Sequence, residues 1–169
     1  MTVDVLLTYN NFVYYIKQNI GGYTTMTSFY VSPSALTMRQ YQYLVKYCVL
    51  FGWKPRFMWP KETFGHNYLV NQKVLKKAAK AIATSDIFIA FMPGTISTCF
   101  EVGIAYSRCE EVLLVAKDPI YFTQTGMADA HIATLPNIKR VCGDLAEIPT
   151  LLQEEYYHLI NIEQLQKQL

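Results

Sequence analysis

The segment from Phe91 to Gly103 combines residue types that could bind a sugar phosphate and act on its sugar. It turns at Pro93-Gly94 and reaches a carboxylate at Glu101; between them lie the hydroxyls of Thr95, Ser97 and Thr98. If a helix begins here, its free N–H groups and partial positive charge favour an anion such as a phosphate. We expect Glu101 in the first helical turn, where the same field keeps it ionised. An ionised carboxylate can attack an anomeric carbon or stabilise positive charge there.

Glu101 also has a purely structural explanation. The sequence Thr98-Cys99-Phe100-Glu101 matches a capping box, in which the glutamate side chain bonds back to the N-cap amide. Gly103, one turn further on, is explained equally by close packing of the helix on a sheet. The residues alone leave both interpretations open.

A central strand and the helix after it must position this segment. Ile87 to Phe91 has no polar residue, as expected of a strand covered on both faces. A helix is predicted from Thr98 to Cys109, and Val112 to Ala116 is another apolar strand. The remaining pattern predicts strands at 3–7, 56–59 and 139–142, a loop over 9–30, and helices from Ser32-Pro33 to Gly52, over 67–84 and from Ile148.

This alternation of strands and helices predicts an α/β fold for residues 1–169 as a single domain. We expect three layers, with a mostly parallel sheet of about five strands and helices on both faces, as in Rossmann-like and flavodoxin-like proteins. Ligands of such sheets lie beyond the carboxyl ends of the strands, beside helix N-termini. The segment from Phe91 to Gly103 occupies that place.

The composition of the chain restricts the classes of binding partner that we expect. A formal charge of +2 gives no argument for binding a nucleic acid polymer, and the lysines at 73, 76, 77 and 80 read as a solvated helix face. Four cysteines without metal-ligand spacing, no leader pattern and no apolar run of membrane length favour the cytoplasm and no membrane partner. The 13 Tyr and 9 Phe suit pocket walls and subunit contacts, so we expect a homo-oligomer.

The stretches Ser85 to Ala90, Thr95 to Gly103 and Val112 to Val115, together with Ala105, resemble the nucleoside 2-deoxyribosyltransferase-like family. That family includes the 2'-deoxynucleoside 5'-phosphate N-hydrolases. The resemblance covers about a fifth of the chain. It implies that Glu101 is the nucleophile that forms a glycosyl-enzyme intermediate, with no metal and no cofactor.

The resemblance also implies substrate-binding residues. Transferases of the family place Asp six residues before the glutamate, whereas the phosphate hydrolases place a hydroxyl residue there, as Thr95 does here. A nucleotide is therefore favoured over a free nucleoside, with Gly94, Ser97 and Thr98 around its phosphate. Thr125 falls at the spacing of a family serine that reaches the phosphate from a neighbouring subunit. Tyr9 matches a family tyrosine of the sugar pocket.

Two departures from the family matter. The family's second carboxylate, which assists protonation of the leaving base, would fall at Ala78. Losing a positioned acid costs on the order of a hundredfold or more in rate. Ser97 and Cys99 replace family glycines and narrow the loop. Asp86 opens a strand, at the wrong end of the sheet for this acid, and is assigned a structural role; the remaining acid candidates are Glu62, His66 and Asp129.

Three functions follow from the sequence. The first is cleavage or transfer of the N-glycosidic bond of a (deoxy)nucleoside 5'-monophosphate through Glu101. The second is a non-catalytic protein of the same fold that sequesters or senses a nucleotide. The third is a phosphoribohydrolase of the lysine-decarboxylase-like group, whose glycine-rich loop Pro93 to Glu101 matches only in part.

Overall fold

The computed structural model describes residues 27–61, 72–123 and 135–156. Within these ranges the chain forms one sheet of five parallel strands in the order β2-β1-β3-β4-β5. The strands are β1 (Ser28–Val31), β2 (Lys54–Pro55), β3 (Ile87–Met92), β4 (Glu111–Ala116) and β5 (Ile138–Cys142). The predicted α/β class with a parallel sheet of about five strands is confirmed.

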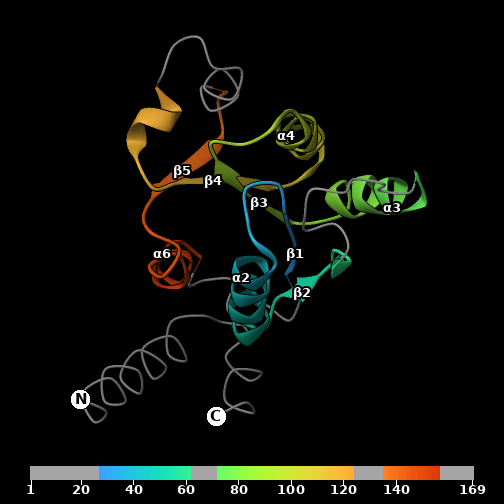
Figure 1. Cartoon of the computed structure of the whole chain (residues 1–169), viewed down its shortest axis with the longest axis horizontal. Helices are drawn as coiled ribbons and strands as arrows, with labels where there is room; N and C mark the ends of the chain where they lie inside the picture. Colours follow the sequence, from blue (N-terminus) through green and yellow to red (C-terminus); the bar gives the residue numbers. More distant parts are fainter. Residues whose placement is uncertain (1–26, 62–71, 124–134, 157–169) are drawn as a thin grey trace.

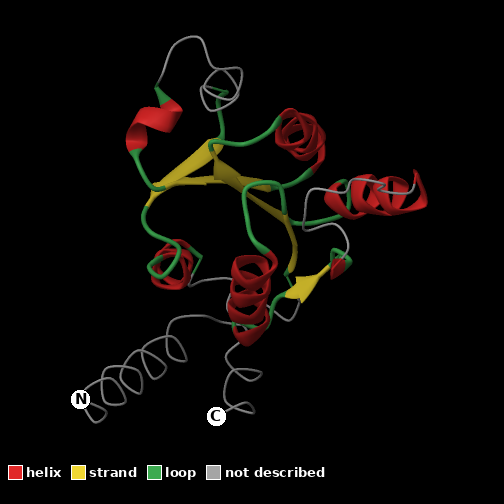
Figure 2. Cartoon of the chain, viewed as in Figure 1, coloured by secondary structure: helices red, strands yellow, loops and turns green. Residues whose placement is uncertain are grey.

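Helices cover both faces of the sheet, giving three layers (Figures 1 and 2). The helices α2 (Met38–Leu50) and α6 (Ile148–Glu155) pack side by side on one face. On the other face, α3 (Gln72–Ile82) packs beside α4 (Ile96–Arg108). A short 3₁₀ helix, η2 (Pro119–Phe122), follows β4. The pair α3 and α4 is the one that frames the site.

The centre of the sheet is built from the two apolar runs that the sequence singles out. All six residues of β3 pair in register with β4, from Ile87 opposite Glu111 to Met92 opposite Ala116. Both strands are buried except for Phe91 and Glu111, which are partly exposed. Apolar side chains on both faces are what a strand needs when helices cover it from two sides.

The strand β1 corrects the sequence interpretation, which assigned residues 9–30 to a loop. All four β1 residues are buried, and β1 pairs with both β2 and β3. The side chain of Asp86 anchors it: Asp86 Oδ2 accepts hydrogen bonds from Ser28 N (2.6 Å) and Ser28 Oγ (2.7 Å). These contacts agree with the structural role assigned to Asp86. The predicted strand at 3–7 lies outside the described residues.

Two predicted boundaries shift because of sheet pairing. The helix predicted at Ser32-Pro33 begins only at Met38, after the N-cap Thr37. Ser32 is not an N-cap: its N–H donates to Ile89 O (2.8 Å), which prolongs the pairing of β1 with β3, and its side-chain oxygen accepts no hydrogen bond from the described residues. The strand predicted at 56–59 is wrong in position: β2 covers Lys54–Pro55, and residues 56–59 form no strand.

The other predicted elements agree closely. The helix α2 ends before Gly52, whose φ of 85° explains the glycine. The described part of the helix predicted over 67–84 is α3, and the last strand and last helix begin at Ile138 and Ile148. In the described ranges no helix has the length and apolar character needed to cross a membrane. The same ranges hold no cluster of three or more His, Cys, Asp or Glu arranged to bind a metal.

The turn before α4 yields a stability prediction. A methyl group at Gly94 would lie 2.7 Å from Thr98 Cβ and 3.0 Å from Thr98 Oγ1, too close for a buried, branched side chain to accommodate. We expect Gly94→Ala to lower the free energy of unfolding by about 1–3 kcal/mol, measured by urea denaturation.

Gly103→Ala is the matched control. A methyl group there meets no atom within 4 Å, so the packing on the sheet proposed for Gly103 is wrong. Alanine in the helix should stabilise the protein by about 0.5–1 kcal/mol. Equal losses in both variants would contradict the close approach assigned to Gly94.

Candidate functional site

The site lies where the sheet order reverses. The chain passes from β1 outward to β2 and then returns to β3 on the other side of β1. In sheets with this order, ligands bind in the crevice beyond the carboxyl ends of β1 and β3. Here those ends lead into Ser32 and into the turn before α4, which places the N-terminus of α4 at the crevice.

The first turn of α4 is capped without Glu101. Thr95 is the N-cap: Thr98 N donates to Thr95 Oγ1 (3.4 Å), and Thr95 N donates to Thr98 Oγ1 (3.0 Å). The predicted capping box from Thr98 to Glu101 is therefore wrong, and so is the placement of Glu101 in the first turn. Because the helix begins at Ile96, Glu101 lies in the second turn and its side chain is available for other contacts.

Glu101 is held by a hydrogen bond from the neighbouring strand. Tyr30 OH donates to Glu101 Oε1 at 3.0 Å. Glu101 Oε2 is shielded from water and has no hydrogen-bond partner among the described residues. The second oxygen is therefore unpartnered but covered, and a ligand atom reaches it only when the atoms around it move.

The surroundings of Glu101 shift the pKa of its carboxyl group. Burial raises the pKa of its carboxyl group above the ordinary value, and the hydroxyls of Ser32 and Tyr30 oppose that rise. Of these two hydroxyls, Tyr30 has full hydrogen-bond geometry, whereas Ser32 Oγ does not. Burial and these local donors therefore act on Glu101 in opposite directions.

A tryptophan fixes the direction of the Tyr30 hydrogen bond. Trp59 Nε1 donates to Tyr30 OH at 3.0 Å. Burial also raises the pKa of Tyr30, so its hydroxyl keeps its single proton. With the indole donating to the hydroxyl oxygen, that proton points to Glu101. The position of Trp59 is itself fixed, since its backbone N–H donates to Tyr41 OH (3.2 Å).

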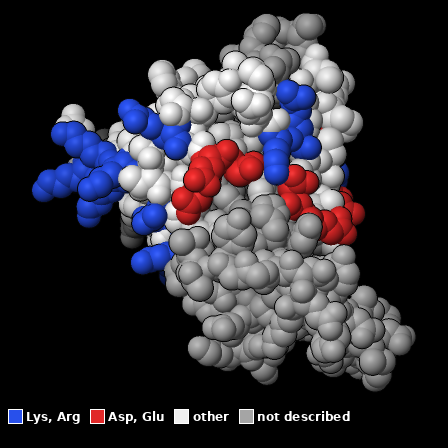
Figure 3. Space-filling model, turned by 180° about the vertical axis from the view of Figure 1, so that it is seen from behind, with Lys and Arg blue, Asp and Glu red and all other residues white. Residues whose placement is uncertain are grey.

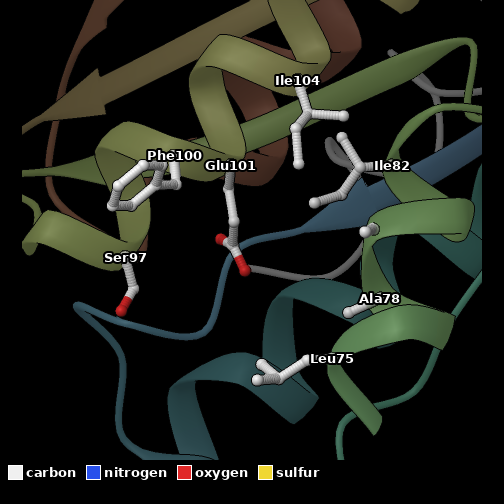
Figure 4. Close-up of a pocket in the computed structure, with 8 residues that line it drawn as sticks. Leu75, Ala78, Ile82, Ser97, Phe100, Glu101 and Ile104 are labelled. Carbon is white, nitrogen blue, oxygen red and sulfur yellow. The ribbon is translucent and has the colours of Figure 1, made fainter. Parts of the chain in front are cut away.

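A cavity of about 270 Å³ separates α3 from α4 beside Glu101 (Figure 4). This is just below the usual range for small-molecule pockets, about 300–1,000 Å³. Two helices supply its walls: Ser97, Phe100, Glu101 and Ile104 come from α4, and Leu75, Ala78, Ala79 and Ile82 come from α3. Glu101 is therefore neither tied to its own backbone nor separated from a cavity.

The structure brings together only part of the predicted site. Glu101 and Ser97 line the cavity, while Thr95 and Thr98 cap the helix and Gly94 packs against Thr98. Tyr9 and Thr125 lie outside the described residues, so their predicted roles stay predictions.

Sequence reasoning missed the roles of Tyr30 and Ser32, whose hydroxyls act on Glu101, and of Trp59, which donates to Tyr30. Tyr30 belonged to the segment interpreted as a loop. The available signal was the short buried run Ser28–Val31 followed by Pro33, which has the length and composition of a parallel strand.

The position at which the sequence lacks the second carboxylate, Ala78, lies in the wall of the cavity. Ala78 is 3% exposed and lines the cavity. The described part of α3 contains no acidic residue, and Asp86 lies at the amino end of β3, paired with Ser28. The other acid candidates, Glu62, His66 and Asp129, lie outside the described residues.

The lysines of α3 lie outside the cavity wall. The residues of α3 that line the cavity form one stripe with helical spacing, and lysines at 73, 76, 77 and 80 occupy the remaining, exposed faces. Figure 3, seen from behind, shows Lys and Arg side chains gathered at the edge of the molecule that α3 forms. These exposures agree with the solvated helix face expected from the sequence.

Comparison with known proteins places the fold. The chain matches no protein-family model and no curated protein sequence. It is similar in structure to the CMP N-glycosidase BcmB of Clostridium botulinum, with a TM-score of 0.52 and 16% identity over 75% of this chain and 99% of that one. A conserved protein of Enterococcus faecalis V583 gives a TM-score of 0.51 and 17% identity over 78% and 99%. The protein is thus an α/β protein of the architecture that these structures share.

The buried carboxyl group predicts a pH-dependent gain in stability on neutralisation. A glutamate whose pKa is raised by folding costs the fold free energy above that pKa and nothing once both states are protonated. We expect Glu101→Gln to raise Tm near pH 7.5, by about 2–4 °C for each kcal/mol that ionisation costs. The gain should shrink to near zero by about pH 4. A Tm gain independent of pH, measured by calorimetry, would contradict this account.

Proposed function

We propose that the protein cleaves or transfers the N-glycosidic bond of a (deoxy)nucleoside 5'-monophosphate, with Glu101 as nucleophile. The observation that carries the proposal is a partly buried glutamate that lines the cavity between α3 and α4 and keeps one oxygen unpartnered. The structural similarity to a CMP N-glycosidase supports the same class of reaction. So does the sequence resemblance to the nucleoside 2-deoxyribosyltransferase-like family around Glu101.

In the proposed mechanism, Tyr30 holds Oε1 while Oε2 bonds to the anomeric carbon. The hydrogen bond from Tyr30 favours the ionised carboxylate against the effect of burial, and the ionised form is the one that attacks. Because neighbouring side chains cover Oε2, the wall must yield when a substrate enters. Phe100 and Leu75, with 73% and 50% exposure, stand at the rim with room to move.

The phosphate is assigned to the N-terminus of α4. Amides of a first helical turn and its partial positive charge favour an anion, and the exposed Ser97 adds a hydroxyl beside the cavity. Thr95 and Thr98 reach the phosphate only if their reciprocal cap opens. Water would release the sugar in a hydrolase and a second base would accept it in a transferase.

A second candidate, a nucleotide-binding protein without catalysis, is favoured by one observation. Where an acid would assist the leaving base, the wall presents the methyl group of Ala78. The cavity and the helix N-terminus would then serve binding alone. A phosphoribohydrolase of the lysine-decarboxylase-like group is not favoured over these two candidates.

Base release tests the nucleophile. Incubation with a panel of 5'-nucleotides and deoxynucleotides, read by chromatography, should show free base from wild type and a loss of at least about 10³-fold in Glu101→Ala. Glu110→Gln is the control, because this exposed residue lies just beyond the same helix and its neutralisation should leave the rate unchanged. Tight binding of a nucleotide in a thermal-shift assay, with no product from any panel member, would instead establish the binder.

The pH profile tests the role of Tyr30. As the pH decreases, kcat/KM falls when the nucleophilic carboxylate becomes protonated; this fall is the acid limb of the pH profile. Because the pKa of Glu101 is raised, we expect the limb at a higher pH than for an ordinary glutamate. Tyr30→Phe removes a donor to the charged form, so the acid limb should move to still higher pH. Tyr106→Phe, a change of the same kind on the partly exposed face of α4, should leave the limb in place. An unmoved limb in Tyr30→Phe would contradict the positioning role.

A further inference from the structure

The wall of the cavity opposite Glu101 is apolar. Every residue that α3 contributes to it is aliphatic: Leu75, Ala78, Ala79 and Ile82. On the α4 side, Ser97 and Glu101 are the polar residues of the eight described residues that line the cavity. A group bonded to the anomeric carbon and extending from Glu101 across the cavity therefore packs against hydrocarbon.

Among the eight described residues that line the cavity, Glu101 is the ionisable one. Lys117 pairs with Asp144, and Lys139 pairs with Glu111 and Glu155; none of these five residues lines the cavity. Glu101 Oε2 is buried without a partner, and a buried, unpartnered carboxylate is costly unless a cation or a donor approaches it. The described lining is complementary to a group with an apolar surface and a positive charge.

We propose, resting on the proposed function, that the substrate is a cationic N-glycoside: a mononucleotide whose base is positively charged at the glycosidic nitrogen or in the same ring system. Pyridinium nucleotides and N7-alkylated purine nucleotides belong to this class. A positive ring pairs with the Glu101 carboxylate. At the rim, the largely exposed ring of Phe100 offers a face for a cation–π contact.

The chemistry of the leaving group is the second argument. As Glu101 bonds to C1', the bond from C1' to nitrogen breaks and its electron pair goes to the nitrogen, which cancels the positive charge. The base then departs neutral and needs no proton. A neutral base such as cytosine would depart as an anion unless protonated, and a positioned acid is typically worth 10²–10⁴-fold. The absence of an acid from the aliphatic wall therefore lowers the cleavage rate of a cationic substrate only slightly.

In the second step of the reaction, water releases the sugar phosphate from Glu101. Water bonds to C1' through its oxygen, the ester to Glu101 breaks, and the carboxylate is restored while one proton goes to solvent. The net reaction converts a cationic N-glycoside and water into a free sugar phosphate, a neutral base and one proton. Cleavage of a neutral nucleotide releases no such proton, so the two substrate classes have different signatures.

The test compares substrates on the full chain. Nicotinamide mononucleotide is set against CMP, and 7-methylguanosine 5'-monophosphate against GMP, with base release followed by chromatography and proton release followed in weak buffer. We expect the cationic member of at least one pair to be cleaved at least 100-fold faster in kcat/KM, with one proton for each base released. Glu101→Gln should abolish both signals.

Placing an acid in the α3 wall of the cavity provides a second test. Ala78→Asp should raise kcat on CMP or GMP by about 10²-fold, while the rate on the cationic partner stays the same or falls. Ala78→Asn is the matched control of equal size without an acid. Because Ala78 is buried, Leu75→Asp at the half-exposed rim provides a second acid whose tolerance does not depend on that position.

The outcomes separate this inference from the proposed function. Cleavage of neutral nucleotides as fast as cationic ones overturns the inference and leaves the N-glycosidase standing. Absence of cleavage with every substrate overturns both and favours the binding protein. A preference for cationic substrates that Ala78→Asp and Leu75→Asp both leave unchanged overturns the role assigned to the wall.

Discussion

The burial of one carboxyl group at the crevice between β1 and β3 is the constraint around which the site is built. Removing a carboxylate from water is costly, and natural proteins keep such a group when neighbouring donors and a function offset the cost. Here the hydroxyl of Tyr30 offsets part of it through a 3.0 Å hydrogen bond, while the unpartnered oxygen leaves the rest unmet. The unpartnered carboxylate oxygen therefore favours a ligand that brings a positive charge or a hydrogen-bond donor to the cavity.

The fold supplies these neighbours from separate parts of the chain. Tyr30 comes from β1, Trp59 follows β2, and Glu101 comes from the helix after β3. Because the sheet order places β1 between β2 and β3, residues far apart in sequence form one chain of hydrogen bonds from indole to phenol to carboxylate. Because the indole N–H of Trp59 can only donate, Trp59 sets the direction of these hydrogen bonds, and the Tyr30 proton points to Glu101.

The architecture alone says little about chemistry, since this topology hosts many unrelated functions. What distinguishes this chain is the contrast between the two cavity walls. The wall from α4 carries Glu101 and Ser97, while the wall from α3 is hydrocarbon, with lysines turned to other faces of that helix. The resemblance around Glu101 favours an N-glycosidic reaction, and the wall at Ala78 restricts which leaving groups that reaction serves well.

The sequence by itself determined the central sheet and the candidate carboxylate. Uninterrupted apolar runs are sufficient to place β3 and β4, and the turn at Pro93-Gly94 is sufficient to place a helix start near Glu101. It did not determine the partners of Glu101, because capping and cavity-facing geometry share the same local pattern. It also missed β1, whose short buried run becomes a strand only through pairing with β2 and β3 and through the anchor at Asp86. Contacts between residues distant in the chain determine both the partners of Glu101 and the formation of β1. The local spacing of residues in the sequence does not reveal such contacts.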